Sequence, residues 1–241
     1  WGGEFLLADY HNFQRVTHFK PLPLPGGDAS TRKPARLAAA YLYANGLSLP
    51  DSSAPAAHLS ETELRLLYQQ IERSINTPLT SSVGRLFDVI SSLVGVCQGA
   101  TYEGQAAIEL EAIVDPTERG EYPLPQTAQG IDPTELLHAV LMDLQNGIAP
   151  ENIAGRFHNS IAACIVRTCE RLAQETGIRE IVLTGGVFQN TTLLSKTAPL
   201  LETANLQVYT HRRVPPNDGG LALGQAVIGL KKWKMSEGEL L

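Results

Sequence analysis

The spacing of hydrophobic and polar residues divides the chain into a helical middle and two ends that contain strands. Residues 4–8 and 14–19 are strand-like, and the residues 9–12 between them predict the turn of a β-hairpin. Residues 21–28, PLPLPGGD, follow the hairpin. Because proline fixes φ and lacks a backbone N–H, this segment is predicted to be a connector and neither a central strand nor a helix.

The middle of the chain, from about residue 30 to residue 176, has the apolar spacing of helices. Helices are predicted over residues 34–44, 60–74, 83–94, 102–114, 132–146 and 150–176. Ser60 and Glu63 have the spacing of a capping box. Gly177 follows the longest predicted helix, at the position where glycine commonly ends one.

The end of the chain has the order strand, helix, strand, helix. Ile181, Val182 and Leu183 form a short apolar run, which predicts a strand buried on both faces. A helix over residues 189–201, a strand over 207–211 and a helix over 221–232 are predicted to follow. The predicted fold class is therefore α/β with a helical insertion, and the predicted parts are residues 1–28, 29–176 and 177–241.

Two glycines between the strand and the helix are candidates for binding a phosphate. Gly185 and Gly186 stand where α/β folds present backbone N–H groups to a ligand, next to the positive end of a helix. Asn190 is predicted in the first turn of that helix, where its amide could reach the same ligand. An ordinary connection, in which the glycines serve only the turn, explains the stretch equally well.

Two other glycine-containing stretches have a functional and a structural interpretation. Gly2 and Gly3 at the start of the hairpin predict either a β-bulge or a second place where the backbone meets a phosphate. Asp218, in the sequence NDGG, is either the N-cap of the last helix, which is the usual role of such a residue, or a metal ligand that faces the cleft of Gly185 and Gly186.

Polar residues within the helical middle provide further candidates. Asp88 lies in an otherwise apolar helix, where it either pairs with Arg85 or points into a cleft. Gln105 and Glu109 are four residues apart and share a helix face, so they could bind the hydroxyl groups of a ribose. The simpler interpretation of that helix, an amphipathic helix with a solvated acidic face, is preferred on these residues alone.

Composition and charge narrow the range of functions. The 241 residues are 43% hydrophobic and carry a formal net charge of -6, which argues against a general nucleic-acid surface. No apolar run is long enough to span a bilayer. Cys97, Cys164 and Cys169 show no CxxC pair, so we expect buried thiols in a reducing cytoplasm. The chain does not begin with Met, and we expect it to be a piece of a longer protein.

Several longer motifs together resemble a known family. They are WGGEFLLADYHNFQRVTHFKPLPLPGGD, TSSVGRLFDVISSLVG, YEGQAAIELE, LTGGVFQN and NDGGLALGQA, in that order along nearly the whole chain. This set resembles the C-terminal part of the HypF carbamoyltransferases of hydrogenase maturation. That part is grouped with the tRNA threonylcarbamoyl-transfer protein TsaD, within the actin/sugar-kinase/Hsp70-like ATPase fold. WGGEF and YEGQAA favour HypF over TsaD.

The resemblance implies a fold, a reaction and a set of ligands. The fold would be a ribonuclease-H-like lobe with a large helical insertion, one of two lobes that hold ATP or carbamoyl-adenylate. The reaction would pass a carbamoyl group to the C-terminal cysteine of the partner HypE, on the way to the cyanide ligand of a [NiFe]-hydrogenase. A divalent metal, Mg or Fe, would take its other ligands from the part of the protein upstream of this chain.

The resemblance also implies a role for each candidate residue. Gly2 and Gly3 match glycines on the phosphate side of the nucleotide, and Asp218 matches a metal ligand. The remaining matches are to nucleoside, ribose and phosphate contacts: Asp88, Gln105, Glu109, Gly185, Gly186 and Asn190. No residue is predicted to act as a covalent nucleophile, and the isolated chain is expected to have weak or no transfer activity. Alternatives are a TsaD-like protein that acts on tRNA and a non-catalytic module that docks a partner protein.

Overall fold

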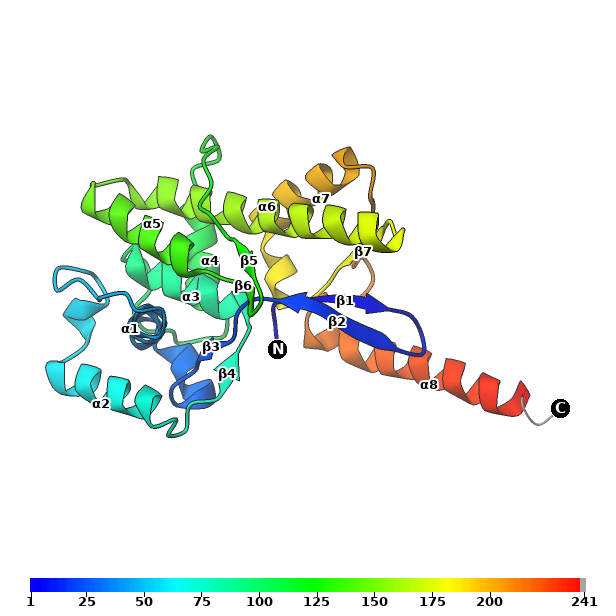
Figure 1. The fold of residues 1–241 in the computed structure, drawn as a ribbon, viewed down its shortest axis with the longest axis horizontal. Coiled ribbons are helices and arrows are strands. Elements are labelled where there is room, and N and C mark those ends of the chain that lie inside the picture. Colours follow the sequence, from blue (N-terminus) through cyan, green and yellow to red (C-terminus); the bar gives the residue numbers. More distant parts are fainter. Residues whose placement is uncertain (239–241) are drawn as a thin grey trace.

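The computed structural model describes residues 1–238, which form a block of helices next to a smaller strand-containing part (Figure 1). The helices are α1 (Pro34–Ala44), α2 (Glu61–Glu72), α3 (Val83–Leu93), α4 (Gln105–Ala112), α5 (Thr134–Gln145), α6 (Pro150–Thr176), α7 (Thr191–Thr203) and α8 (Leu221–Gly238). The strands are β1 (Glu4–Ala8), β2 (Phe13–His18), β3 (Leu22–Pro23), β4 (Leu79–Thr80), β5 (Gln126–Thr127), β6 (Gly130–Ile131), β7 (Glu180–Leu183) and β8 (Gln207–Thr210).

Local sequence signals explain several of the helix boundaries. Pro34 and Pro150 are the first residues of α1 and α6, where the missing N–H of proline costs no hydrogen bond. Ser60 and Glu63 form the predicted capping box at the start of α2. Gly177 ends α6 with φ +77°, a left-handed conformation that favours glycine. The predicted bounds of α1 and α6 are confirmed at both ends.

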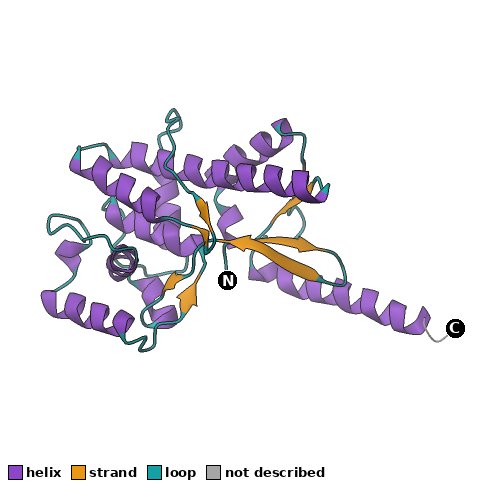
Figure 2. Cartoon of the chain, viewed as in Figure 1, coloured by secondary structure: helices purple, strands orange, loops and turns teal. Residues whose placement is uncertain are grey.

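Short strands lie among and beside the helices (Figure 2). The predicted hairpin is confirmed, since β1 and β2 pair antiparallel with Glu4 opposite His18. β7 and β8 pair parallel, which requires a crossover connection, and α7 provides it. Residues 21–28 contain the two-residue strand β3, which among the described strands pairs only with β4, so the prediction that they form no central strand is confirmed. Two departures from the prediction are found: a 3-10 turn, Gly27–Arg32, begins within these residues, and the middle of the chain contains β4, β5 and β6 as well as helices.

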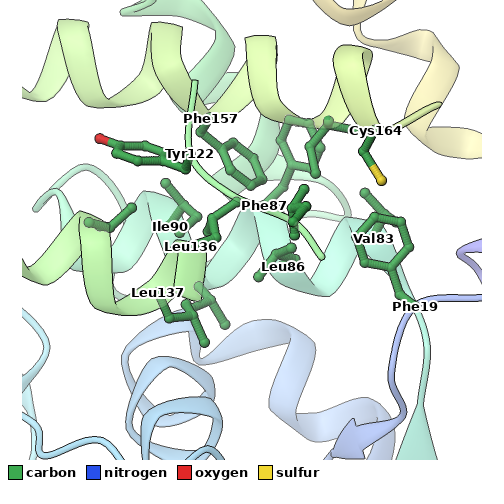
Figure 3. Close-up of a cluster of buried hydrophobic side chains, with 14 of the residues drawn as sticks. Phe19, Val83, Leu86, Phe87, Ile90, Tyr122, Leu136, Leu137, Phe157 and Cys164 are labelled. Atoms are coloured by element: carbon green, nitrogen blue, oxygen red, sulfur yellow. The ribbon is translucent and has the colours of Figure 1, made fainter. Parts of the chain in front are cut away.

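The core is centred on α3, which is buried on nearly every side. Nine of its eleven residues are buried, and its Phe87 ring meets Phe157 of α6 edge to face at 4.7 Å between ring centroids. Leu136 and Leu137 of α5 are fully buried in the same cluster (Figure 3). Burying one such side chain stabilises the fold by about 1.5–3 kcal/mol. This cluster holds α3, α5 and α6 together as one unit.

The C-terminal part has apolar surface that is not covered. Val182 of β7 is 62% exposed and Tyr209 of β8 is 47% exposed, so the prediction of a strand buried on both faces is wrong. Ile181 and Val208, on the other face of the pair, pack against the hydrophobic core, whereas the residues described here provide nothing that covers Val182 and Tyr209. Residues 221–234 of α8 are all exposed. No helix in the described part of the chain is both long enough and apolar enough to cross a membrane.

Candidate functional site

Two glycine-containing loops meet at the carboxyl ends of β7 and β8. The backbone N–H of Gly185, after β7, donates to the carbonyl of Pro216, after β8, at 2.8 Å. His211 and Thr184 add a side-chain hydrogen bond of 2.9 Å between the same two loops. In parallel sheets, loops at the carboxyl ends of strands are the usual place for ligands. The structure therefore brings the loop of Asp218 next to the predicted glycine pair.

The glycine turn has an open backbone. Gly185 has φ +101°, a backbone conformation that requires glycine. The surrounding space would accommodate a side chain, because a Cβ added there would meet no atom within 4 Å. Gly186 begins a 3-10 turn that runs to Gln189. The N–H groups of Gly186 and Val187 have no acceptor among the residues that the structure describes, as is usual at the start of a helical turn. They are two donors available to a ligand.

The start of α7, in contrast, is already occupied by protein groups. Glu111, on α4, accepts hydrogen bonds from the Thr191 hydroxyl and from the Thr192 backbone N–H, both at 2.8 Å. The sequence predicts that the helix following the glycines begins at residue 189 and offers its positive end to a phosphate. The helix begins at Thr191, and the carboxylate of Glu111 lies at that end. The free donors belong to the 3-10 turn that precedes it.

Asn190 is the N-cap of α7 and is buried. Its Oδ1 accepts from the Leu193 N–H at 2.7 Å, and its Nδ2 lies 3.0 Å from Nε2 of His158, on α6. His158 is fully buried, and this burial lowers its pKa below the usual value. Both polar atoms of the Asn190 amide thus have protein partners. The predicted contact between Asn190 and a ligand stays a prediction. Such a contact would require the amide to share or release one of its two protein partners.

The hairpin glycines lie against the first turn of α3. A Cβ added to Gly3 would lie 2.4 Å from the carbonyl oxygen of Ser81, so no side chain fits there. The N–H groups of Gly2 and Gly3 both donate to the carboxylate of Glu4. Burial alone would raise the pKa of Glu4, but hydrogen bonds, first from Ser81 and then from Arg15, lower it below its usual value. A phosphate at these glycines would have to displace Glu4.

This first turn of α3 also reaches the glycine turn. A Cβ added to Gly84 would lie 3.8 Å from Cγ2 of Val187, and Gly84 immediately follows Val83, whose N–H donates to the Gly2 carbonyl at 3.3 Å. The predicted residues Gly2, Gly3, Gly185 and Gly186 are therefore arranged around the start of α3, although they are far apart in the sequence.

Three other predicted contacts form a group around Cys97. Asp88 pairs with Arg85 at 2.7 Å, which confirms the local ion pair, and burial raises its pKa to about 6 although Arg85 opposes the shift. Gln105 donates to Glu109 at 2.7 Å, which confirms that they share a helix face. Burial, together with Glu109 and Asp88, raises the pKa of the Cys97 thiol to about 11. Sequence reasoning missed Cys97 as their neighbour, because it lies between α3 and α4.

Asp218 is exposed and lies in a three-residue 3-10 turn. Asn217 rather than Asp218 caps this turn, since its Oδ1 accepts from the Gly219 N–H at 3.1 Å. Among the side chains that the structure describes, residues 1–234, no group of three or more His, Cys, Asp and Glu could hold a metal ion. These residues do not form a metal site by themselves, so a metal at Asp218 would need ligands from beyond them.

Comparison with known proteins shows that the chain is a Kae1-like domain. Residues 1–225 match the family described as the carbamoyltransferase Kae1-like domain, second subdomain. The chain belongs to this family, that of the HypF carbamoyltransferases, and the resemblance and the fold class predicted from the sequence are confirmed.

Individual relatives agree with this assignment. The chain is 41% identical to the carbamoyltransferase HypF of Rhodobacter capsulatus over 235 residues, which is 96% of this chain and 30% of that protein. A crystal structure of full-length HypF in the phosphate- and nucleotide-bound form superposes with a TM-score of 0.88 at 36% identity, over 96% of this chain and 36% of that one. The tRNA N6-adenosine threonylcarbamoyltransferase of Methanopyrus kandleri is 31% identical over 61% of this chain and 40% of that protein. The chain thus spans about a third of the length of its HypF relatives.

Proposed function

We propose that this chain forms one lobe of a carbamoyltransferase site that binds ATP or carbamoyl-adenylate and delivers the carbamoyl group to the C-terminal cysteine of a HypE-type acceptor protein. The observation that carries the proposal is the open turn at Gly185 and Gly186, with two N–H donors that have no acceptor among the described residues, in a chain of the HypF family. The phosphate- and nucleotide-bound form of a HypF relative supports it. The product would serve the cyanide ligand of a [NiFe]-hydrogenase.

In the proposed reaction, these donors act on the leaving group. The acceptor thiolate attacks the carbamoyl carbon, a C–S bond forms, and the bond from that carbon to the phosphate oxygen breaks. AMP leaves with the electron pair. The N–H groups of Gly186 and Val187 would stabilise the charge that develops on the leaving phosphate, as fixed donors do in other acyl transfers. Asp88, Gln105 and Glu109 would contact the nucleoside, and a divalent metal, Mg or Fe, would assist if the upstream part of the protein completes its ligand set.

Two features of the chain bear on the cellular compartment and the partners of the proposed enzyme. The three cysteines are buried and unpaired, which fits a cytoplasmic enzyme. The apolar faces of β7, β8 and α8 fit a lobe that packs against the upstream part of the same protein. A tRNA substrate is the second candidate, favoured by the Methanopyrus kandleri relative but opposed by the net charge of -6.

Calorimetric titration of ATP and Mg²⁺ tests the proposal, with this chain alone and with the upstream part of the Rhodobacter capsulatus relative added. The informative variant is Gly186→Ala, because its new Cβ would lie 3.9 Å from the nearest atom and so fits the fold, yet it would narrow the backbone approach. Gly99→Ala is the matched control, since a Cβ there meets nothing within 4 Å.

We expect Gly186→Ala to weaken ATP binding by on the order of tenfold or more, with an unchanged melting temperature, and Gly99→Ala to bind as the unmodified chain does. Equal affinity in both variants would show that the glycine turn is not the site. If no ATP binds even with the upstream part present, the proposal is wrong and the partner-docking interpretation takes its place. Titration with tRNA in the same series tests the second candidate.

A further inference from the structure

His158 occupies an unusual position for an ionisable residue. It lies in the third turn of α6, has no exposed surface, and meets the ring of Phe87 nearly at right angles, with 5.2 Å between ring centroids. A buried polar group is costly unless it is hydrogen-bonded, and an apolar residue would fill this place without that cost. Its two ring nitrogens therefore need partners, and both have one.

Those two partners fix the chemical form of the ring. Nδ1 lies 2.8 Å from the carbonyl oxygen of Ala154, one turn earlier in α6. A carbonyl can only accept, so Nδ1 carries the proton. In the neutral ring Nε2 is then an acceptor, and it takes a hydrogen bond of 3.0 Å from Nδ2 of Asn190. The Asn190 amide is oriented by this contact, with its nitrogen toward His158 and its oxygen toward the Leu193 N–H.

We propose that His158 is a positioning residue for the glycine turn, which it holds in place through the Asn190 side chain. The connection is short. The backbone N–H of Asn190 donates to the carbonyl of Val187 at 3.1 Å, and Val187 carries one of the two free donors. The identity of the ligand that the turn binds rests on the proposed function, whereas the positioning of the turn by His158 does not.

The neutral ring is required for this arrangement. A protonated His158 would place an N–H at Nε2 against the N–H groups of the Asn190 amide. The amide would have to rotate, and its oxygen would leave the Leu193 N–H. The charged groups that face the ring from neighbouring helices are Glu111 on α4, which favours protonation, and Lys196 on α7, which opposes it. Burial outweighs both and lowers the pKa of the ring.

The test compares His158→Gln with His158→Met. The two side chains have nearly the same shape, but the glutamine amide oxygen can accept the hydrogen bond from Asn190 and the methionine thioether is a weak acceptor. Amide hydrogen exchange of this chain, without any nucleotide, measures the positioning at the N–H groups of Asn190 and Leu193. His138→Met, an exposed histidine on α5, is the control.

We expect exchange at Asn190 and Leu193 to be on the order of tenfold faster in His158→Met than in the unmodified chain, and close to normal in His158→Gln and His138→Met. Equal protection in His158→Met and the unmodified chain would overturn the inference. If both His158 variants lose protection equally throughout the chain, including the buried α1, the residue is a core packing residue only, which also overturns it.

ATP binding, measured with the upstream part present, then separates the two proposals. We expect affinity to fall on the order of tenfold in His158→Met and to be retained in His158→Gln. If the exchange result is as expected but the unmodified chain binds no ATP, the proposed function fails and the positioning role stands. If the methionine variant loses protection but binds ATP as tightly as the unmodified chain, the positioned turn is not what holds the nucleotide, and the inference is overturned in its functional part.

Discussion

Replacing Asn190 by alanine should destabilise the protein, and the structure gives the size of the effect. The substitution removes the N-cap of α7, a hydrogen bond of 2.7 Å to the Leu193 N–H, and loss of such a cap costs about 1 kcal/mol. It also leaves Nε2 of the fully buried His158 without a donor, which costs about 1–3 kcal/mol. The sum is about 2–4 kcal/mol, or roughly 4–16 °C in melting temperature for a chain of this length.

Two further variants divide this cost between its causes. Asn190→Asp keeps an acceptor for the Leu193 N–H but has no N–H for His158, so at neutral pH it should lose only the second contribution. As the pH falls, His158 can take up a proton and donate to the new carboxylate, so the difference from the unmodified chain should shrink. Gln189→Ala changes an exposed side chain of the same turn and should have nearly no effect.

Urea unfolding, followed by circular dichroism, gives the free energy of unfolding of each variant. The expected order of stability at pH 7 is the unmodified chain and Gln189→Ala together, then Asn190→Asp, then Asn190→Ala. An Asn190→Ala variant as stable as Gln189→Ala would refute the reasoning, because it would mean that neither hydrogen bond contributes. The same result would restore Asn190 as a residue whose amide is free to bind a ligand.

Three further predictions concern pH and packing. Burial raises the pKa of Asp88 to about 6 from 3.8, so protonation of Asp88 favours the folded state, and this contribution to stability is lost as the pH rises through about 6. In urea unfolding between pH 4 and pH 7, the unmodified chain should lose up to about 3 kcal/mol relative to Asp88→Asn. A difference between the two proteins that does not change with pH would contradict this. Burial lowers the pKa of His158 from 6.5, so stability should be complete above that pH and fall as the pH drops below it; this part of the pH dependence of the melting temperature should be absent in His158→Gln. Gly3→Ala would place a Cβ 2.4 Å from the Ser81 carbonyl oxygen and should lower the free energy of unfolding in urea by about 1–3 kcal/mol. The control Gly99→Ala should lower it by less than about 1 kcal/mol. Equal values for the two variants would show that the hairpin does not pack closely on α3.

The features that could be predicted from the sequence are those whose causes lie within a few residues. The start of α2 follows from the capping box of Ser60 and Glu63, and the end of α6 follows from Gly177. The hairpin and the parallel strands at the end of the chain follow from local alternation and apolar runs. The pairing of Asp88 with Arg85 is also local, because residues three apart share a helix face.

The features that could not be predicted depend on residues far apart in the sequence. The start of α7 is filled by Glu111, which is eighty residues earlier than Thr191, so the sequence around the glycines could not show that this helix end is occupied. His158 is thirty-two residues before Asn190, and neither residue alone indicates a hydrogen bond. The exposed face of β7 was missed for a similar reason, since burial depends on what covers a strand and its own apolar residues do not determine that.

These long-range contacts change the role of the helical block. Glu111 from α4 and His158 from α6 both bind the chain at residues 190–192, immediately after the 3-10 turn that carries the free donors. Phe87 of α3 packs against the ring of His158, and α3 also carries Gly84, which lies against Val187. Three helices of the block thus act on one short segment of the C-terminal part. A fixed set of donors stabilises a developing charge better than a mobile one, because it needs no reorganisation during the reaction. In a lobe whose candidate phosphate site is two backbone N–H groups of an open turn, Glu111, His158 and Phe87 therefore contribute to the site by holding the turn, without touching the phosphate.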